Sequence, residues 1–235
     1  MIWKEIKLSA DEKSYIRKGM PLFKGKQFLE ALSFHPPGIA AVKDETGAYH
    51  IDSNGKPLYD KRYIRTFGIY NERATVVTNN GFAHIDSNGK EAHEHQFNWA
   101  GNYQEGLCSV RDETFNYYHI DLDGNRAYNT DYRYAGDFKY GIACVMLSNE
   151  RWTHIDRNGN LLHGKVFCEV GVYHKGLATA RDEAGWFHID KEARPLYTHR
   201  FSSIEPFYNG ISLATIKGEK VLIQESGEIF QLKAV

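Results

Sequence analysis

Cysteine is scarce in this sequence. The 235 residues include only Cys108, Cys144 and Cys168, which share no short metal-binding spacing. An odd number of cysteines without a close pair favours neither a disulfide framework nor a cysteine zinc site. Two of them lie in the apolar runs GLCSV and GIACV, where a small buried thiol is expected. We therefore predict reduced thiols and a cytoplasmic location.

Long apolar runs and an excess of one charge are also missing. No window approaches the ~20 apolar residues of a membrane span, and the start, MIWKEIKLSADEKSYIRKG, has no apolar core of signal-peptide length. The 29 basic and 30 acidic residues give a formal net charge of −1. Because bulk electrostatics would attract neither phosphate backbones nor anionic lipids, we expect no nucleic-acid partner and no membrane partner.

Aromatic residues and glycine, by contrast, are plentiful. The sequence has 15 Tyr, 13 Phe, 4 Trp and 21 Gly. Aromatic side chains suit strands, and glycine supplies the positive φ angles of tight turns. This composition predicts an all-β protein of short strands.

A short motif recurs along the chain. HIDSNG begins at residues 50 and 84, HIDLDG at 119, HIDRNG at 154 and HIDKEA at 188, so the steps are 34, 35, 35 and 34 residues. A degenerate sixth copy, VLIQESG at 221–227, has Leu222 and Gln224 in place of the histidine and the aspartate. Each copy follows an apolar string such as GLCSV or GIACV. Self-similarity at such a period predicts a repeat architecture, in which one unit cannot bury its own apolar face.

Each unit is predicted to contain about four short strands, with the Asp-x-Asn-Gly stretch forming a hairpin turn. Six ~35-residue units over residues 28–235 predict a compact six-bladed β-propeller. Because 35 residues is short for a four-stranded blade, an open stack of three-stranded units is the alternative.

Residues 1–27 lie outside the repeat and are predicted to cap one end of it. Ser9 and Glu12 have capping-box spacing, and Gly19 and Pro21 are stop signals. We therefore expect a short helix at about residues 10–18.

The stretch GLCSVRDETFNYYHIDLDGNRAY resembles the WG-repeat family of bacterial proteins, and the resemblance covers about residues 28–235. Units of that family pair a Gly-Leu-Ala-x-Val strand with an aromatic-x-Ile-Asp-x-x-Gly hairpin. The HID form is similar to a subgroup sometimes attached to enzymatic domains such as methyltransferases. This chain departs from the name-giving dipeptide, since Gly185 precedes Trp186. The resemblance implies the architecture, and the family has no general activity to carry over.

The motif places a histidine two residues before an aspartate, on one face of a strand. Such a pair could bind a metal ion or act as an acid–base site. A catalytic site needs one asymmetric constellation, however, whereas five copies serve something that every unit needs. We therefore predict a structural His–Asp hydrogen bond in each unit, with no metal ion and no cofactor. The residues concerned are His50, Asp52, His84, Asp86, His119, Asp121, His154, Asp156, His188 and Asp190. In the same way, His93 and His95 of EAHEHQF are interpreted as part of a solvated edge strand rather than as metal ligands.

A ring side chain precedes each apolar strand by three residues, and this column is predicted to pack between units. Its members are His35, Tyr70, Tyr103, Phe138, Tyr173 and Phe207. His35, followed by two prolines, departs from the column and is expected to have a specific role. The next two positions vary freely between units, which is how repeat proteins build ligand surfaces.

These variable positions predict a ligand-binding surface. Its candidate residues are His35, Tyr103, Lys139, His174, Lys175, Glu205 and Tyr208. Glu205 stands where other units have glycine, so it would cluster with His35, His174 and Lys175 if the first and last units met in a closed ring.

The predicted function is that of a non-catalytic binding module, a monomer that recognises a protein partner or a small polar ligand through loops on one face. Two alternatives stay open. The chain could be an enzyme, or the substrate-recognition half of one, with His35, His174, Lys175 and Glu205 as acid–base and substrate-holding groups. It could also be a lectin-like module that binds carbohydrate on exposed Tyr and Trp rings.

Overall fold

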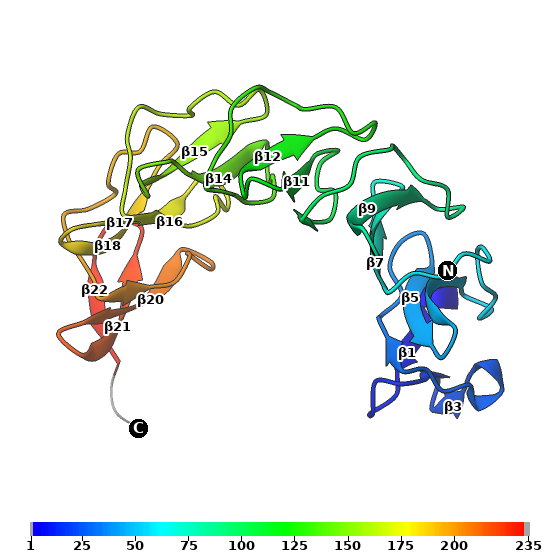
Figure 1. Cartoon of the computed structure of the whole chain (residues 1–235). Helices are drawn as coiled ribbons and strands as arrows, with labels where there is room; N and C mark the ends of the chain where they lie inside the picture. The colour runs from blue at the N-terminus through cyan, green and yellow to red at the C-terminus, as the bar shows by residue number, and fades with distance from the viewer. Residues whose placement is uncertain (1, 233–235) are drawn as a thin grey trace. The chain divides into compact units, whose positions relative to one another are not determined.

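The computed structural model describes residues 2–232, and these residues form antiparallel β-sheets and two short 3-10 helices (Figure 1). The part of the chain that is described contains no α-helix, and no helix in it is both long enough and apolar enough to span a membrane. The chain divides into two compact units. The first unit is Met1–Phe115 with His119–Arg126, and the second is Asn116–Tyr118 with Ala127–Val235.

Six small sheets follow one another along the sequence, one for each repeat, and a seventh precedes them. The preceding elements are η1 (Ile2–Glu5), β1 (Ile6–Leu8), β2 (Tyr15–Arg17), β3 (Met20–Pro21) and η2 (Phe23–Gly25). The first three repeat sheets are β4 (Glu30–Ala31), β5 (Ile39–Asp44) and β6 (Gly47–Asp52); β7 (Arg65–Tyr70), β8 (Arg73–Thr78) and β9 (Gly81–Asp86); and β10 (Trp99–Ala100), β11 (Cys108–Arg111) and β12 (Tyr117–Ile120). The last three are β13 (Tyr134–Ala135), β14 (Ile142–Met146) and β15 (Trp152–Asp156); β16 (Glu169–Val170), β17 (Ala178–Asp182) and β18 (Gly185–Ile189); and β19 (Ser203–Ile204), β20 (Ile211–Ile216), β21 (Glu219–Gln224) and β22 (Ile229–Gln231).

Each repeat sheet is a meander in which neighbouring strands are consecutive in the sequence. Five of the six have three strands, and only the last has a fourth, β22. The predicted fourth strand is reduced elsewhere to isolated bridges, such as Ile155↔Leu161 and Trp152↔Phe167 in the fourth repeat. Between those two bridges the chain leaves the ladder and places His163 beside His154. The prediction of four strands per unit is therefore wrong for five repeats.

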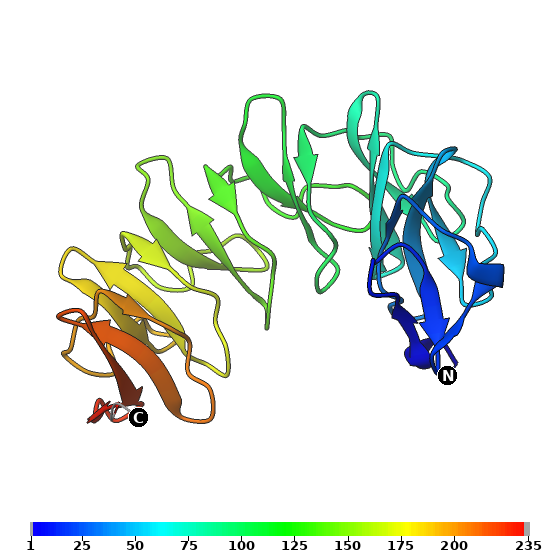
Figure 2. The same cartoon turned by 90° about the horizontal axis from the view of Figure 1, so that it is seen from below.

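In the first five repeats the second and third strands each bury three or four consecutive residues, so both faces of the sheet are covered there, whereas β20 and β21 of the last repeat alternate. The isoleucine after the motif histidine, or after Leu222 in the last repeat, is fully buried or nearly so, and the set is Ile51, Ile85, Ile120, Ile155, Ile189 and Ile223. Burying such a side chain contributes about 1.5–3 kcal/mol. In the second unit, Figure 2 shows β13–β15, β16–β18 and β19–β22 stacked in chain order, from green to red. Each sheet there buries apolar side chains against the next.

The predicted helix at residues 10–18 is wrong, because this stretch closes a β-hairpin instead. Ser9 and Ser14 bond each other through backbone and side chain, with the Ser14 backbone N–H donating to the Ser9 hydroxyl at 3.0 Å. The Ser9 hydroxyl donates to Asp11 at 2.5 Å. The helix-capping residues therefore stabilise a turn. Tyr15 then buries its ring with Phe28 and Phe34, so the segment adds a sheet to the first repeat.

Candidate binding surface at the hairpin tips

The motif histidine uses both ring nitrogens inside the fold. In the first repeat, Nε2 of His50 lies 2.7 Å from the carbonyl oxygen of Phe67, which can only accept, so Nε2 carries the proton. The hydroxyl of Tyr59 then donates to Nδ1, at 2.5 Å. Asp52 is occupied elsewhere, since its carboxylate accepts the backbone N–H groups of Asn54 and Lys56, both at 2.9 Å. The predicted His–Asp hydrogen bond is therefore wrong, and the two residues have separate structural roles.

The same arrangement returns in the second unit. His188 pairs with the Tyr197 hydroxyl at 2.5 Å and with the Glu205 carbonyl at 2.9 Å. His154 pairs with Nε2 of His163 at 3.2 Å and with the Gly171 carbonyl at 2.9 Å. In each case the carbonyl lies in or just after the first strand of the next sheet, so the histidine ties consecutive sheets together.

The partner nine residues after the motif histidine was missed by the sequence analysis. It alternates between tyrosine and histidine and recurs at the period of the motif, which is the signal that could have revealed it. The positions are Tyr59, His93, Tyr128, His163 and Tyr197. His93 belongs to this column, with Nε2 at 3.1 Å from Nδ1 of His84. Residues 92–96 form a loop, so the predicted edge strand at His93 and His95 is also wrong.

Burial keeps the motif histidines neutral. It lowers the pKa of His50, His154 and His188 to about 4, and that of His84 to about 3. A neutral imidazole whose nitrogens are both hydrogen-bonded offers neither a proton nor a lone pair to a ligand near pH 7. The repeated motif therefore acts as a structural element.

A two-residue turn joins the first two strands of the second to sixth repeat sheets, at the same end of the sheet as the turn that follows the third strand. In the first repeat this turn has three residues, Pro36 to Gly38. His174 and Leu177 exchange two backbone hydrogen bonds, at 2.8 and 3.1 Å, and Lys139 and Ile142 do the same. The central residues have positive φ, for example Lys175 at 50° and Tyr140 at 54°. A turn with positive φ at both central positions matches the twist of the strands and favours Asn and Gly. Lysine and tyrosine at such positions are unusual, which makes them candidates for function.

The turns also correct the predicted column of rings. The bridged pairs are His35↔Ile39 in the first repeat and Tyr70↔Arg73 in the second, so His35 and Tyr70 are the half-buried residues that begin the turn, as His174 is. Their rings lie 5.7 Å apart. The buried column is instead Phe34, Ile69, Tyr103, Phe138, Tyr173 and Phe207. His35 therefore does not depart from its column.

Tyr103 was predicted to bind ligand, but its side chain is only 1% exposed. Its hydroxyl donates to the carbonyl of Asp121 at 3.0 Å, and Tyr173 bonds Asp190 in the same way at 2.7 Å. These buried tyrosines therefore stabilise the turns that follow the third strand by bonding the backbone of their first residue. Tyr103 does not reach the surface.

The turns of the second unit present polar and aromatic side chains, which we call the tip surface: Lys139, Tyr140, His174, Lys175, Tyr208, Asn209 and Glu225. Tyr208 is 78% exposed and Tyr140 is 58% exposed. The Tyr140 ring lies 6.3 Å from the His174 ring and 5.5 Å from Nζ of Lys139.

A hollow of about 300 Å³ opens beside these rings. Its lining includes His174, Lys175, Asn209 and Glu225, over the ring of Phe207. Glu205, which was predicted to join this group, contributes its backbone carbonyl to His188 and is not part of the lining. The hollow thus offers a cation, a carboxylate, an amide and an imidazole to a polar group.

Comparisons with known proteins agree with this architecture. The family model described as WG containing repeat matches residues 85–113. None of the curated proteins matches the sequence. Among solved structures, a eukaryotic initiation factor is 11% identical, with 97% of this chain and 72% of that chain covered and a TM-score of 0.64.

Two other solved structures are similar to this chain. BamB from Moraxella catarrhalis is 9% identical, over 92% of this chain and 75% of that chain, with a TM-score of 0.51. Hsv2p from Kluyveromyces lactis is 9% identical, over 93% of this chain and 88% of that chain, with a TM-score of 0.50. All three neighbours have propeller-like folds, and likeness at such low identity shows the fold alone.

Proposed function

We propose that this chain is a non-catalytic interaction module and that the tip surface of its second unit binds a protein partner. The observation that carries the proposal is the exposure of Tyr208 and Tyr140 at turn positions. Tyrosine is enriched at protein interfaces, because it buries a large rigid area and keeps a polar end.

The adjoining hollow supports a protein partner with a polar anchor side chain. It is large enough, at about 300 Å³, to admit a side chain, and Lys175 and Glu225 offer opposite charges within it. Tyr140 and Tyr208 are not part of the lining of the hollow, so a ligand confined to the hollow would leave most of their area unused. A peptide segment can bury both rings and place one polar side chain between the charges.

Selection from a displayed random-peptide library tests this function. We expect the protein to select peptides, and the double substitution Tyr140→Ser with Tyr208→Ser to weaken their binding at least about tenfold. Phe115→Ser is a matched control, because Phe115 is 62% exposed on a different turn. Peptides that bind the double variant and the parent equally would contradict the proposal.

We also propose that the six repeat sheets close into one ring, and that the other repeats belong to the WG type in its HID-containing form. The regular motif spacing and the propeller-like neighbours support both proposals. A compact 235-residue monomer has a radius of gyration of about 18 Å, which solution scattering can measure. A clearly larger value for a monomer would contradict closure.

The chain is further proposed to work in the cytoplasm. The three cysteines support this, since they carry thiols and two of them are buried in the sheets. Localisation of a tagged copy of the natural protein in its host checks this assignment.

A further inference from the structure

One position of the repeat carries an aromatic ring in four repeats and lacks it in the first. It lies two residues before the motif histidine and holds Phe82, Tyr117, Trp152 and Trp186 in the second to fifth repeats. In the first repeat it holds Ala48. The last repeat, which has lost the motif histidine, has Lys220 there.

Where the ring is present, it fills space beside its sheet. Trp152 and Trp186 pack against the apolar cluster of the second unit. Trp152 pairs across its sheet with Met146, and Met146 pairs with Tyr134, whose ring lies 5.3 Å from that of Trp152. The guanidinium of Arg181 lies 5.8 Å from the Trp186 ring.

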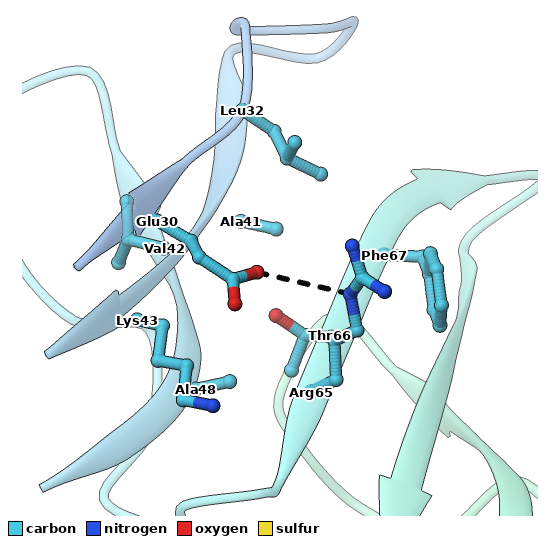
Figure 3. A pocket seen from close by; sticks show the side chains of 9 residues that line it. All are labelled: Glu30, Leu32, Ala41, Val42, Lys43, Ala48, Arg65, Thr66 and Phe67. Atoms are coloured by element: carbon cyan, nitrogen blue, oxygen red, sulfur yellow. Dashed lines mark ion pairs between the residues drawn. The ribbon is translucent and has the colours of Figure 1, made fainter. Parts of the chain in front are cut away.

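In the first repeat the corresponding space is a hollow of about 130 Å³, which we call the Ala48 hollow (Figure 3). Ala48, Val42 and Thr66 are buried in its wall, and Leu32 is partly exposed at its edge. Across the sheet, Ala48 pairs with Lys43, and Lys43 pairs with Glu30. These three positions correspond to Trp152, Met146 and Tyr134 of the fourth repeat, which pair in the same order. The hollow therefore lies at the position where the other repeats supply a ring.

The rim of the hollow carries more positive than negative charge. Two cationic side chains, Lys43 and Arg65, line it together with one carboxylate, that of Glu30. Figure 3 shows Glu30 of β4 and Arg65 of β7 pointing toward each other, with the two groups 3.7 Å apart. Both side chains are at least half exposed, and an exposed ion pair of this kind adds little stability. An anionic ligand that bonds Arg65 more favourably can therefore displace the Glu30 carboxylate from it.

We propose that the Ala48 hollow binds an aromatic ring that carries an anionic group. The size fits, since a cavity of about 150 Å³ accepts benzene. The shape fits, because the same backbone register accommodates a ring in four other repeats. The charge fits, because Lys43 and Arg65 both line the hollow and can meet the anion. This site lies in the first unit and does not depend on the tip surface of the second.

The ring can come from a free aromatic acid or from an aromatic residue beside an acidic one in a peptide. Calorimetric titration with N-acetyl-phenylalanine and with an acetylated, amidated Asp-Phe-Asp peptide distinguishes these sources by which one binds more tightly. N-acetyl-phenylalanine amide, which has the same ring and no charge, is the control. We expect it to bind at least about fivefold more weakly than the acid. Absence of binding by both charged probes at millimolar concentration would overturn the proposal.

Two substitutions locate the site. Ala48→Phe places in the first repeat the ring that Phe82 supplies in the second, and we expect a folded protein with at least about tenfold weaker binding. Glu30→Gln removes the competing carboxylate from an exposed position and should strengthen binding of the acid about threefold or more. Unchanged affinity in a folded Ala48→Phe protein would refute the proposal. Should that variant fail to fold, unchanged affinity in Glu30→Gln would do so.

Discussion

The hydroxyl of Tyr59 donates to Nδ1 of His50 at 2.5 Å, and this places a buried imidazole in one defined tautomer. Its Nε2 proton can then bond only an acceptor, which is the carbonyl of Phe67 in the next sheet. Burying either group of this pair without a partner is costly. The repeated histidine therefore connects one sheet to the next.

Removal of the tyrosine hydroxyl should weaken this connection. Tyr59→Phe leaves Nδ1 of a fully buried histidine without a donor, and we expect the free energy of unfolding to fall by about 1–3 kcal/mol. Tyr59→His should recover part of that loss, because His93 and His163 hold the same position in other repeats. Urea unfolding followed by fluorescence measures both. A Tyr59→Phe protein as stable as the parent would contradict the role of the hydroxyl donor.

Stability should also decrease in mild acid. Burial lowers the folded-state pKa of His50, His154 and His188 to about 4 and that of His84 to about 3, whereas an unfolded histidine titrates near 6.5. The unfolded state therefore takes up protons first as the pH falls. The contribution is fully present above about pH 6.5 and is lost progressively toward pH 4, by at most about 1.4 kcal/mol per histidine for each pH unit.

Thermal unfolding at pH 7.5, 6.5, 5.5 and 4.5 measures this loss. A His188→Gln protein should be less stable than the parent at pH 7.5, because it loses the bonds to Tyr197 and Glu205. Its stability should also depend less steeply on pH between 6.5 and 4.5, because one titrating group is gone. An identical pH dependence in the two proteins would contradict the assignment of the effect to these histidines.

The sequence predicts the period, the all-β class and the turns, because each depends on residues close together in the chain. The partners of His50 lie nine and seventeen residues away, so the two-residue spacing to Asp52 could not reveal them. A comparison of all repeats at position 59 would have shown the Tyr and His alternation.

The binding surface was harder to predict, since a shift of one residue exchanges buried and exposed side chains. Pro36 and Pro37 add a residue to the first turn, and the second turn uses Asn71 and Glu72, both with positive φ, instead of ending in glycine. Alignment on glycine therefore misplaced His35 and Tyr70. The Ala48 hollow needed the structure, because its far wall comes from Arg65 and Thr66 of the next sheet.

Substitution by alanine should cost more stability at a glycine of the Asp-x-x-Gly turn than at a glycine of the two-residue turn between the first two strands. Gly55 has φ of 79°, and an added Cβ would lie 2.5 Å from the Phe23 ring. Gly176 has φ of 86°, but a Cβ there would meet nothing within 4 Å. Alanine at either site costs about 1 kcal/mol of backbone strain, and overpacking at Gly55 adds about 1–3 kcal/mol. Ala193 shows that this turn accepts a Cβ at φ of 57° where the neighbouring side chains permit it. Urea unfolding of Gly55→Ala and Gly176→Ala compares the two sites, and equal losses would show that backbone conformation alone selects glycine in the motif.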